Sequence, residues 1–202
     1  EYRVMGTSAN PKPVMMYLHG SGDDGSTLDR RIGSFFRRWY IVVIPIGYER
    51  GWNATTEVTT APDLEFLEQI VLSVTSFENV QDNVAIVGSS NGASMTQRMM
   101  IESNLPQIRA AVCLVSQLSA LQHAQGGFRA QGPRGGHNGY VADFADLATP
   151  RDDRKIAILV GKADRVVTNE FVTLDDSAYT SPAGKMHSLR DSAFMWAAIL
   201  AG

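Results

Sequence analysis

A serine stands between two glycines at residues 88–92, in the pattern Gly88-x-Ser90-x-Gly92. The apolar run before it, residues 84–87, predicts a buried strand, and residues 93–100 after it predict a helix. A strand, a tight turn and a helix with a serine at the apex are the context of a nucleophile elbow. Glycine leaves room for such a turn, and the amides at the positive end of the helix face the hydroxyl. The pattern therefore predicts that Ser90 is a nucleophile.

A serine alcohol needs a base in contact with it, and that base needs a carboxylate to hold its tautomer. In an elbow-bearing sheet the chain order is Ser, then Asp or Glu, then His. Of the four histidines, His187 fits best, because it follows the last strand-like segment and precedes the terminal helix. His123 and His137 come after Ser90 but before any plausible acid, so they are the alternatives. His19 precedes the nucleophile, and we expect it to shape its loop through backbone hydrogen bonds.

The best candidate for the acid is Asp164. It follows the apolar run at residues 156–160 after a short turn. A carboxylate at this place can reach a histidine on the next loop, which favours a pair of Asp164 with His187. Asp175 and Asp176 are the alternatives, and an aspartate that only caps a turn is the common case.

Acyl transfer also needs hydrogen-bond donors for the oxyanion of the tetrahedral intermediate. One expected donor is the backbone N–H of Asn91, directly after the nucleophile. The second should come from the loop after the apolar run at residues 14–18, and we favour the N–H of Ser21, with Gly22 as the alternative. This loop lacks the lysine and the glycine spacing of a phosphate-binding loop, which argues against a nucleotide site.

Trp52 lies in the loop after another apolar run, residues 41–44, on the same expected rim. It is either a wall of the substrate pocket or a packed anchor of its loop. As substrate-binding candidates we therefore name His19, Gly22 and Trp52. No His, Cys, Asp or Glu cluster has metal-ligand spacing, so we expect neither a metal nor another cofactor.

The elements that must position these residues alternate along the chain. Solid apolar runs separated by helical patterns predict an α/β protein, a mostly parallel sheet with helices on both faces. Ligands bind beyond the carboxyl ends of such strands, so the polar segments that begin near residues 19, 46, 89, 116 and 161 should share one rim. Residues 116–154 are polar and glycine-rich, and we expect them to form a cap or loop insertion that borders the site.

Composition narrows the class of protein. With 202 residues the chain is expected to form one domain, residues 1–202. The formal net charge is −3 and no basic stripe is present, so nucleic acid is not an expected partner. No apolar run approaches the roughly 20 residues of a membrane span. The lone Cys113 lies in an apolar run and is expected in the core. Because Glu1 is not a methionine, we expect a processed or trimmed chain, and a secreted, periplasmic or cytoplasmic location fits equally.

Four ordered motifs together resemble the α/β-hydrolase family: residues 18–25 (LHGSGDDG), residues 87–95 (VGSSNGASM), residues 160–164 (VGKAD) and the late His187. Within that family, the Ser-Asn-Gly-Ala-x-Met elbow is similar to the poly(3-hydroxybutyrate) depolymerase-like and feruloyl-esterase-like group, whose elbow commonly reads Ser-Asn-Gly-Gly-Met. The resemblance implies a reduced α/β-hydrolase fold. It also implies a triad of Ser90, Asp164 and His187, with the oxyanion donors Ser21 and Asn91.

The function that follows is a serine carboxylic-ester hydrolase that passes through an acyl-enzyme. The compact chain has no sign of a separate substrate-binding domain, which favours small or soluble esters over polymers. A peptidase or thioesterase on the same fold is the alternative. A non-catalytic binding protein is a third hypothesis, and the presence of all three triad residues argues against it.

Overall fold

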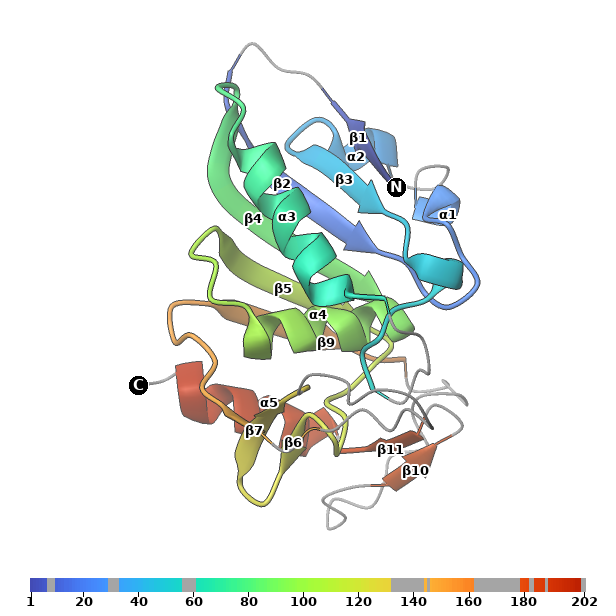
Figure 1. Cartoon of the computed structure of the whole chain (residues 1–202), viewed down its shortest axis with the longest axis vertical. Coiled ribbons are helices and arrows are strands. Elements are labelled where there is room, and N and C mark those ends of the chain that lie inside the picture. Colours follow the sequence, from blue (N-terminus) through green and yellow to red (C-terminus); the bar gives the residue numbers. More distant parts are fainter. Residues whose placement is uncertain are drawn as a thin grey trace.

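A mostly parallel sheet forms the centre of the molecule (Figure 1). The structure is a computed structural model that describes residues 1–6, 10–28, 33–55, 61–131, 144, 146–161, 179–181, 184–187 and 189–200. The central strands are, in chain order, β1 (Tyr2–Met5), β2 (Lys12–Leu18), β3 (Ile41–Pro45), β4 (Val80–Ser89), β5 (Ile108–Leu114) and β9 (Lys155–Leu159). They stand side by side in the order β1-β3-β2-β4-β5-β9. The edge strand β1 is antiparallel to β3, and the other neighbouring pairs are parallel. The predicted mostly parallel sheet is thus confirmed.

Three helices cover one face of the sheet: α3 (Asp63–Thr75), α4 (Asn91–Glu102) and α5 (Leu189–Leu200). In Figure 1, α3 and α4 lie across the front of the strands. Leu67, Ile70, Val71 and Val74 recur at spacings of three and four along α3, and all four are buried. They share the main core with the buried side chains of β2, β4 and α4. Burial of this apolar stripe is what fixes α3 against the sheet.

The opposite face carries two short helices, α1 (Ser26–Leu28) and α2 (Ser34–Phe36). Leu28 and Phe36 pack there against the side chains of Tyr17 and Ile44 in a second, smaller apolar cluster. Helices therefore lie on both faces, as predicted. Residues 29–32 between these two helices lie outside the described part.

The chain after β5 adds two small sheets at the lower end of Figure 1. The strands β6 (His123–Ala124), β7 (Gly127–Ala130) and β8 (Asp146–Ala148) form a three-stranded antiparallel sheet, and β10 (Tyr179–Ser181) pairs with β11 (Gly184–Met186). The segment 116–154 thus contains strands of its own, which its weak periodicity did not predict. A short 3-10 helix, η2 (Tyr48–Arg50), follows β3.

Strand register brings four strand ends to one edge of the sheet. Leu18 pairs with Gly88, and Ser89 pairs with Leu114, which pairs in turn with Leu159. Since these strands are parallel, the segments that leave them begin side by side. This edge is the rim on which the sequence placed its candidate residues.

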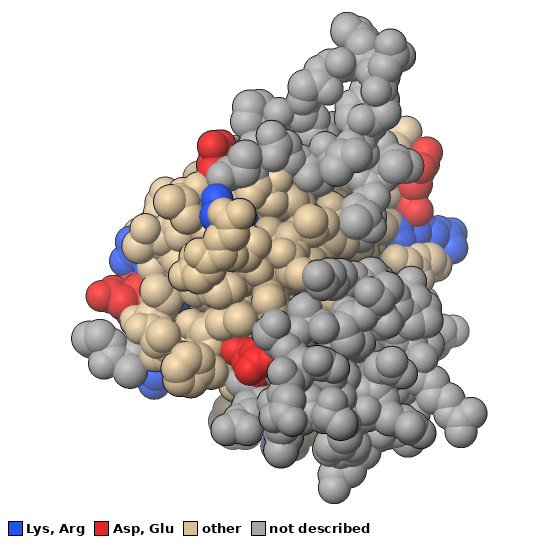
Figure 2. Space-filling model, turned by 90° about the horizontal axis from the view of Figure 1, so that it is seen from below, with Lys and Arg blue, Asp and Glu red and all other residues tan. Residues whose placement is uncertain are grey.

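The described residues form no concentrated basic area on the face drawn in Figure 2. There the Lys and Arg side chains of the described residues are scattered among uncharged and acidic ones. Within the same described part, no helix has both the length and the apolar character needed to cross a bilayer.

Candidate active site

Ser90 forms the turn between β4 and α4 in a backbone conformation that L-residues seldom adopt, with φ 53° and ψ −122°. Its N–H donates to the carbonyl oxygen of Leu114 (2.8 Å), and its own carbonyl accepts the N–H of Ala93 (2.8 Å). A non-glycine residue in such a region costs about 1–3 kcal/mol and persists only where its surroundings impose it. Here β5 and the first turn of α4 impose the conformation of Ser90.

The two glycines of the motif are required by contact. A Cβ at position 88 would overlap the carbonyl oxygen of Gly92 and the hydroxyl of Thr96. A Cβ at position 92 would overlap the carbonyl oxygen of Leu18, the last residue of β2. Helix α4 therefore begins directly against the ends of β2 and β4, and this close approach puts Ser90 at the apex.

The loop after β2 forms a tight turn over residues 20–23. The N–H of Asp23 donates to the carbonyl oxygen of Gly20 (3.1 Å), and Gly22 has φ 80°, as the third residue of a type II turn requires. The amide of Gly22, which was the alternative to Ser21 as an oxyanion donor, already donates to the carbonyl oxygen of Arg50 (2.8 Å). For the exposed Ser21, no hydrogen bond of the N–H is found among the described residues.

His19 and Trp52 are packed inside their loops. His19 is fully buried. Its Nδ1 donates to the carbonyl oxygen of Gly20 (2.8 Å), and its Nε2 accepts the N–H of Gly47 (3.1 Å), which specifies the neutral Nδ1–H tautomer. Trp52 is 1% exposed, and its indole N–H donates to the carbonyl oxygen of His19 (2.9 Å). These contacts agree with the loop-shaping role expected of His19 and favour the anchor interpretation of Trp52. A role of either side chain in binding substrate stays a prediction.

The side chain of Asn91 makes two hydrogen bonds with the backbone of Trp52. Its Oδ1 accepts the Trp52 N–H (2.8 Å), and its Nδ2 donates to the Trp52 carbonyl oxygen (3.0 Å). Asn91 is also the first residue of α4. The residue whose amide was predicted as an oxyanion donor is thus attached, through its side chain, to the loop after β3.

His187 directly follows β11 and is buried, at 7% exposure. Its N–H donates to the carbonyl oxygen of Leu118 (2.9 Å), in the segment that follows β5. Its Nε2 lies 2.7 Å from the carbonyl oxygen of His123. A carbonyl can only accept, so Nε2 carries a proton in this conformation. Among the described residues no hydrogen bond joins His187 to Ser90.

The rings of His123 and His187 pack edge to face with centroids 5.6 Å apart, and Phe128 packs edge to face with His123 at 5.0 Å. Burial lowers the pKa of His123 below its ordinary value, and the neighbouring charge of protonated His187 lowers it further. His123 therefore favours its neutral form beside the predicted base. Asp164, Asp175, Asp176 and His137 lie outside the described residues.

A buried polar network fixes α4 to the segment after β5, and the sequence analysis missed it. The hydroxyls of Ser94 and Ser116 are 2.8 Å apart, and the Gln97 amide donates to the carbonyl oxygen of Gln117 (2.8 Å). The amide of Gln122 donates to the Ser94 carbonyl oxygen (2.9 Å). The sequence feature that could have revealed this network is the presence of the polar residues Ser94 and Gln97 among the apolar residues of a helix that follows a buried strand.

Arg154 caps the far end of α4 and was also missed. It is 3% exposed, and its guanidinium donates to backbone carbonyl oxygens of α4, the loop after it and the start of β5: Met99, Met100, Ser103, Leu105 and Ile108. Burial lowers its pKa to about 10, so it remains a cation at neutral pH. A cation at the C-terminal end of a helix also interacts favourably with the helix dipole.

Beside Ser90, Tyr17 and Ser89 form a polar pair on the strand ends. Burial raises the pKa of Tyr17, the carboxylate of Asp23 raises it further, and a side-chain hydrogen bond with Ser89 opposes the shift. Tyr17 therefore stays a neutral phenol at physiological pH, and the Ser89 hydroxyl is engaged with it.

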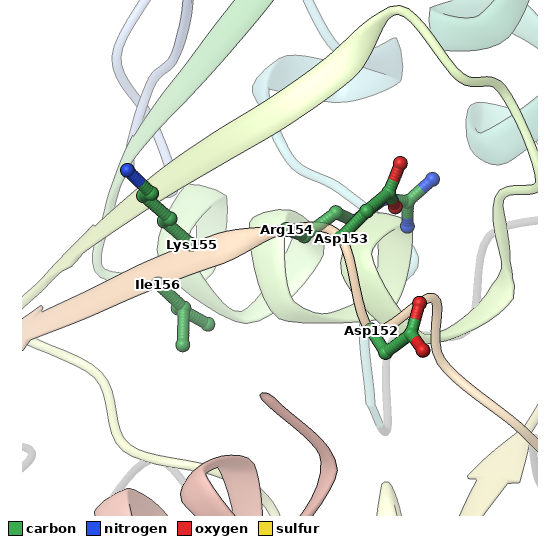
Figure 3. A pocket seen from close by; sticks show the side chains of 5 residues that line it. All are labelled: Asp152, Asp153, Arg154, Lys155 and Ile156. Carbon is green, nitrogen blue, oxygen red and sulfur yellow. The ribbon is translucent and has the colours of Figure 1, made fainter. Parts of the chain in front are cut away.

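An open hollow of about 450 Å³ lies at the opposite end of the sheet (Figure 3). It is lined by residues 152–156, and Lys155 and Ile156 leave β9 in opposite directions. Lys155 pairs with Ala110 near the start of β5, whereas Ser90 follows the carboxyl end of β4. The hollow is therefore separate from the candidate site. Across the described residues, no group of three His, Cys, Asp or Glu side chains could hold a metal ion.

No family model matches the chain, and no curated protein matches its sequence. Among solved structures, LpqC, a poly(3-hydroxybutyrate) depolymerase from Bordetella parapertussis, matches 99% of this chain and 72% of its own, at 14% identity and TM-score 0.59. A serine-to-cysteine form of pOPH in complex with DMSO matches 97% of this chain and 70% of its own, at 14% identity and TM-score 0.54.

The chain spans only 42% of MenH from S. aureus, over 57% of its own length, at 17% identity and TM-score 0.43. At identities this low, the likeness to LpqC and pOPH establishes the fold. The chain has an α/β-hydrolase fold of small size, as its motifs predicted.

Proposed function

We propose that this protein is a serine carboxylic-ester hydrolase that acts on small or soluble esters. The observation that carries the proposal is the turn at Ser90. A serine is held at φ 53° between two glycines that have no room for a side chain, at the end of a central parallel strand. Such a turn presents the hydroxyl above the strand ends, where a sheet of this kind binds its ligand.

In the proposed reaction, the Ser90 Oγ attacks the ester carbonyl carbon while His187 takes the Ser90 proton. The amides of Ser21 and Asn91 donate to the oxyanion that forms. The alcohol leaves with a proton from His187, and a water that His187 deprotonates then releases the acid from the acyl-enzyme. Asp164 is proposed to hold the His187 tautomer.

The recorded position of His187 sets a condition on this mechanism. Its Nε2 faces the His123 carbonyl oxygen at 2.7 Å. A base must present an unprotonated nitrogen to the serine. Because Asp164 is proposed to hold Nδ1, Nε2 must leave the His123 carbonyl oxygen before it can take the Ser90 proton.

Hydrolysis of p-nitrophenyl acetate, butyrate and octanoate tests the function, together with an organophosphonate label mapped by mass spectrometry. We expect turnover, a label on Ser90, and loss of both in Ser90→Ala. Ser89→Ala is the matched control, because this adjacent serine is engaged with Tyr17, and it should keep both. Turnover of acyl-thioesters or aminoacyl amides in preference to esters would change the substrate class. Neither turnover nor label would overturn the proposal.

A further inference from the structure

The loop at residues 47–52 contacts both segments that carry the predicted oxyanion donors. We call it the template loop. It follows β3, includes η2 and ends at the buried Trp52. Only its last residue, Trp52, was a site candidate in the sequence, and no residue of the loop belongs to the predicted triad or supplies a predicted oxyanion amide.

The first contact fixes the elbow. The carboxamide of Asn91 makes two hydrogen bonds with the backbone of Trp52, one accepted at 2.8 Å and one donated at 3.0 Å. Two bonds from a planar carboxamide set both the distance and the orientation of the Asn91 backbone relative to the loop. The N–H of that same residue is the donor predicted from α4.

The second contact fixes the turn after β2. The Arg50 carbonyl oxygen accepts the Gly22 N–H (2.8 Å), and the Gly22 amide is adjacent to that of Ser21. His19, one residue before this turn, accepts the Gly47 N–H at Nε2 (3.1 Å), and its carbonyl oxygen accepts the Trp52 indole N–H (2.9 Å). Both ends of the template loop therefore attach to the segment that carries Ser21.

The template loop has a strained backbone. Glu49 and Arg50 have φ 52° and 59°, in the left-handed region that favours glycine, and a Cβ at Gly47 would overlap the Gly51 carbonyl oxygen. Backbone strain of this kind, about 1–3 kcal/mol for each residue, clusters where geometry serves function. The loop is held at its other side as well, since Arg98 donates to the Asn53 carbonyl oxygen (2.6 Å).

We infer that the template loop sets the separation of the two oxyanion donors, and that the Asn91 carboxamide is its positioning residue. The attachment points on the loop, at Arg50 and Trp52, are two residues apart. One short, rigid piece of backbone therefore positions the amides of both Ser21 and Asn91. This inference rests on the proposed function. Oxyanion donors act through placement within a fraction of an ångström, so loosening the template should weaken catalysis without weakening ground-state binding.

The test replaces Asn91 by alanine, which leaves its backbone N–H in place. A misplacement of about 1 Å costs on the order of 100-fold in rate. We therefore expect Asn91→Ala to lower kcat by about 10–100-fold. The rate of phosphonate labelling at Ser90 should fall by the same factor, while KM and the acid limb of the pH profile stay unchanged. Asn83→Ala is the matched control, because Asn83 is exposed on β4, and it should match the wild type.

Trp52→Phe is the second variant: it keeps an aromatic ring at this buried position and removes the indole N–H bond to the His19 carbonyl oxygen. We expect a smaller fall in kcat, and it decides the question if Asn91→Ala does not fold. Wild-type kcat in both variants, or a rise in KM with kcat unchanged, would overturn the proposed role of the template loop. The proposed esterase function would still stand. An unlabelled and inactive wild type would instead overturn the proposed function, and the template with it.

Discussion

Ser90 and His187 are anchored in different ways. Ser90 is surrounded by the ends of β2, β4 and β5 and by its own helix, and the two glycines of its motif have no spare space. His187 is held by two hydrogen bonds to carbonyl oxygens of the segment after β5, at Leu118 and His123. The nucleophile is thus positioned by close backbone contacts with β2, β5 and α4, whereas the base is positioned by hydrogen bonds to carbonyl oxygens more than sixty positions earlier.

This difference indicates which of the two side chains can change its position during the reaction. A residue whose neighbours are backbone atoms in contact cannot move without disturbing its surroundings, while a ring positioned by side-chain hydrogen bonds, such as the one that His187 Nε2 donates to His123, can turn about its side-chain bonds. We therefore expect substitution of the glycines beside Ser90 to act on the fold, and substitution of His187 to act on the reaction.

The largest expected effect is that of His187→Ala on activity. If His187 is the base, its loss should lower kcat by about 10²–10⁴-fold while the melting temperature changes little. Hydrolysis of p-nitrophenyl acetate at pH 8 measures it. His123→Ala is the control, because its carbonyl oxygen remains, and it should retain kcat within about tenfold. Equal losses in the two variants would make His123 a candidate for the base.

On the nucleophile side, Gly92→Ala should destabilise the protein by about 3 kcal/mol or prevent folding, because the new Cβ meets backbone atoms of β2. Urea unfolding followed by circular dichroism measures it. At Gly161 a Cβ has open space, so Gly161→Ala should change the stability by less than about 0.5 kcal/mol. A stable Gly92→Ala protein would show that the elbow can relax, and the contrast between the two regions would be lost.

Arg154→Met should cost about 2–4 kcal/mol of stability, because several backbone carbonyl oxygens lose a charged donor in a buried place. The adjacent, exposed Lys155 offers the control Lys155→Met, which should cost less than about 0.5 kcal/mol. The same urea titration compares the two. Equal costs would mean that α4 does not depend on its distal cap.

A smaller effect concerns pH. Because the pKa of His123 is lowered in the folded state, the unfolded chain binds more protons there below the ordinary value near 6.5. Stability should therefore fall as the pH drops from about 6.5 toward the folded pKa, and His123→Gln should remove that part of the loss. Unfolding free energies of both proteins between pH 8 and pH 5 give the difference. If the unfolding free energies of the two proteins changed with pH in parallel, His123 would not be the source of the loss.

The smallest effect is expected at Cys113. Its thiol is fully buried, and burial raises its pKa well above the ordinary value. A thiol reagent such as DTNB should leave it unmodified in the native protein and react fully in urea. Fast native labelling would show that β5 opens locally.

Patterns within one element predicted the fold well. Apolar runs located the central strands, and the glycine-serine spacing located the turn at residue 90, because both depend on residues close together in the chain. The prediction was weakest where an element is short or polar. The strand β6 has two residues, and β4 begins at Val80, which pairs with Lys12 ahead of three exposed polar residues.

Contacts between distant segments were not predictable in the same way. The role of Arg154 depends on carbonyl oxygens about fifty residues earlier, and that of Asn91 on a loop thirty-nine residues earlier. The residues next to Arg154 and Asn91 in the sequence do not indicate which distant segment each side chain binds. For Trp52 the sequence left two interpretations, and only its burial separates them.

The helix α4 is attached at both ends, through Ser90 and Asn91 at one and Arg154 at the other. A helix of this kind cannot fray from either terminus. Its amide hydrogens should therefore exchange with deuterium only when the whole sheet opens, and they should report the global unfolding free energy. The exchange rate along residues 93–102 would then be nearly uniform, in contrast to the graded rates of a helix with a free end.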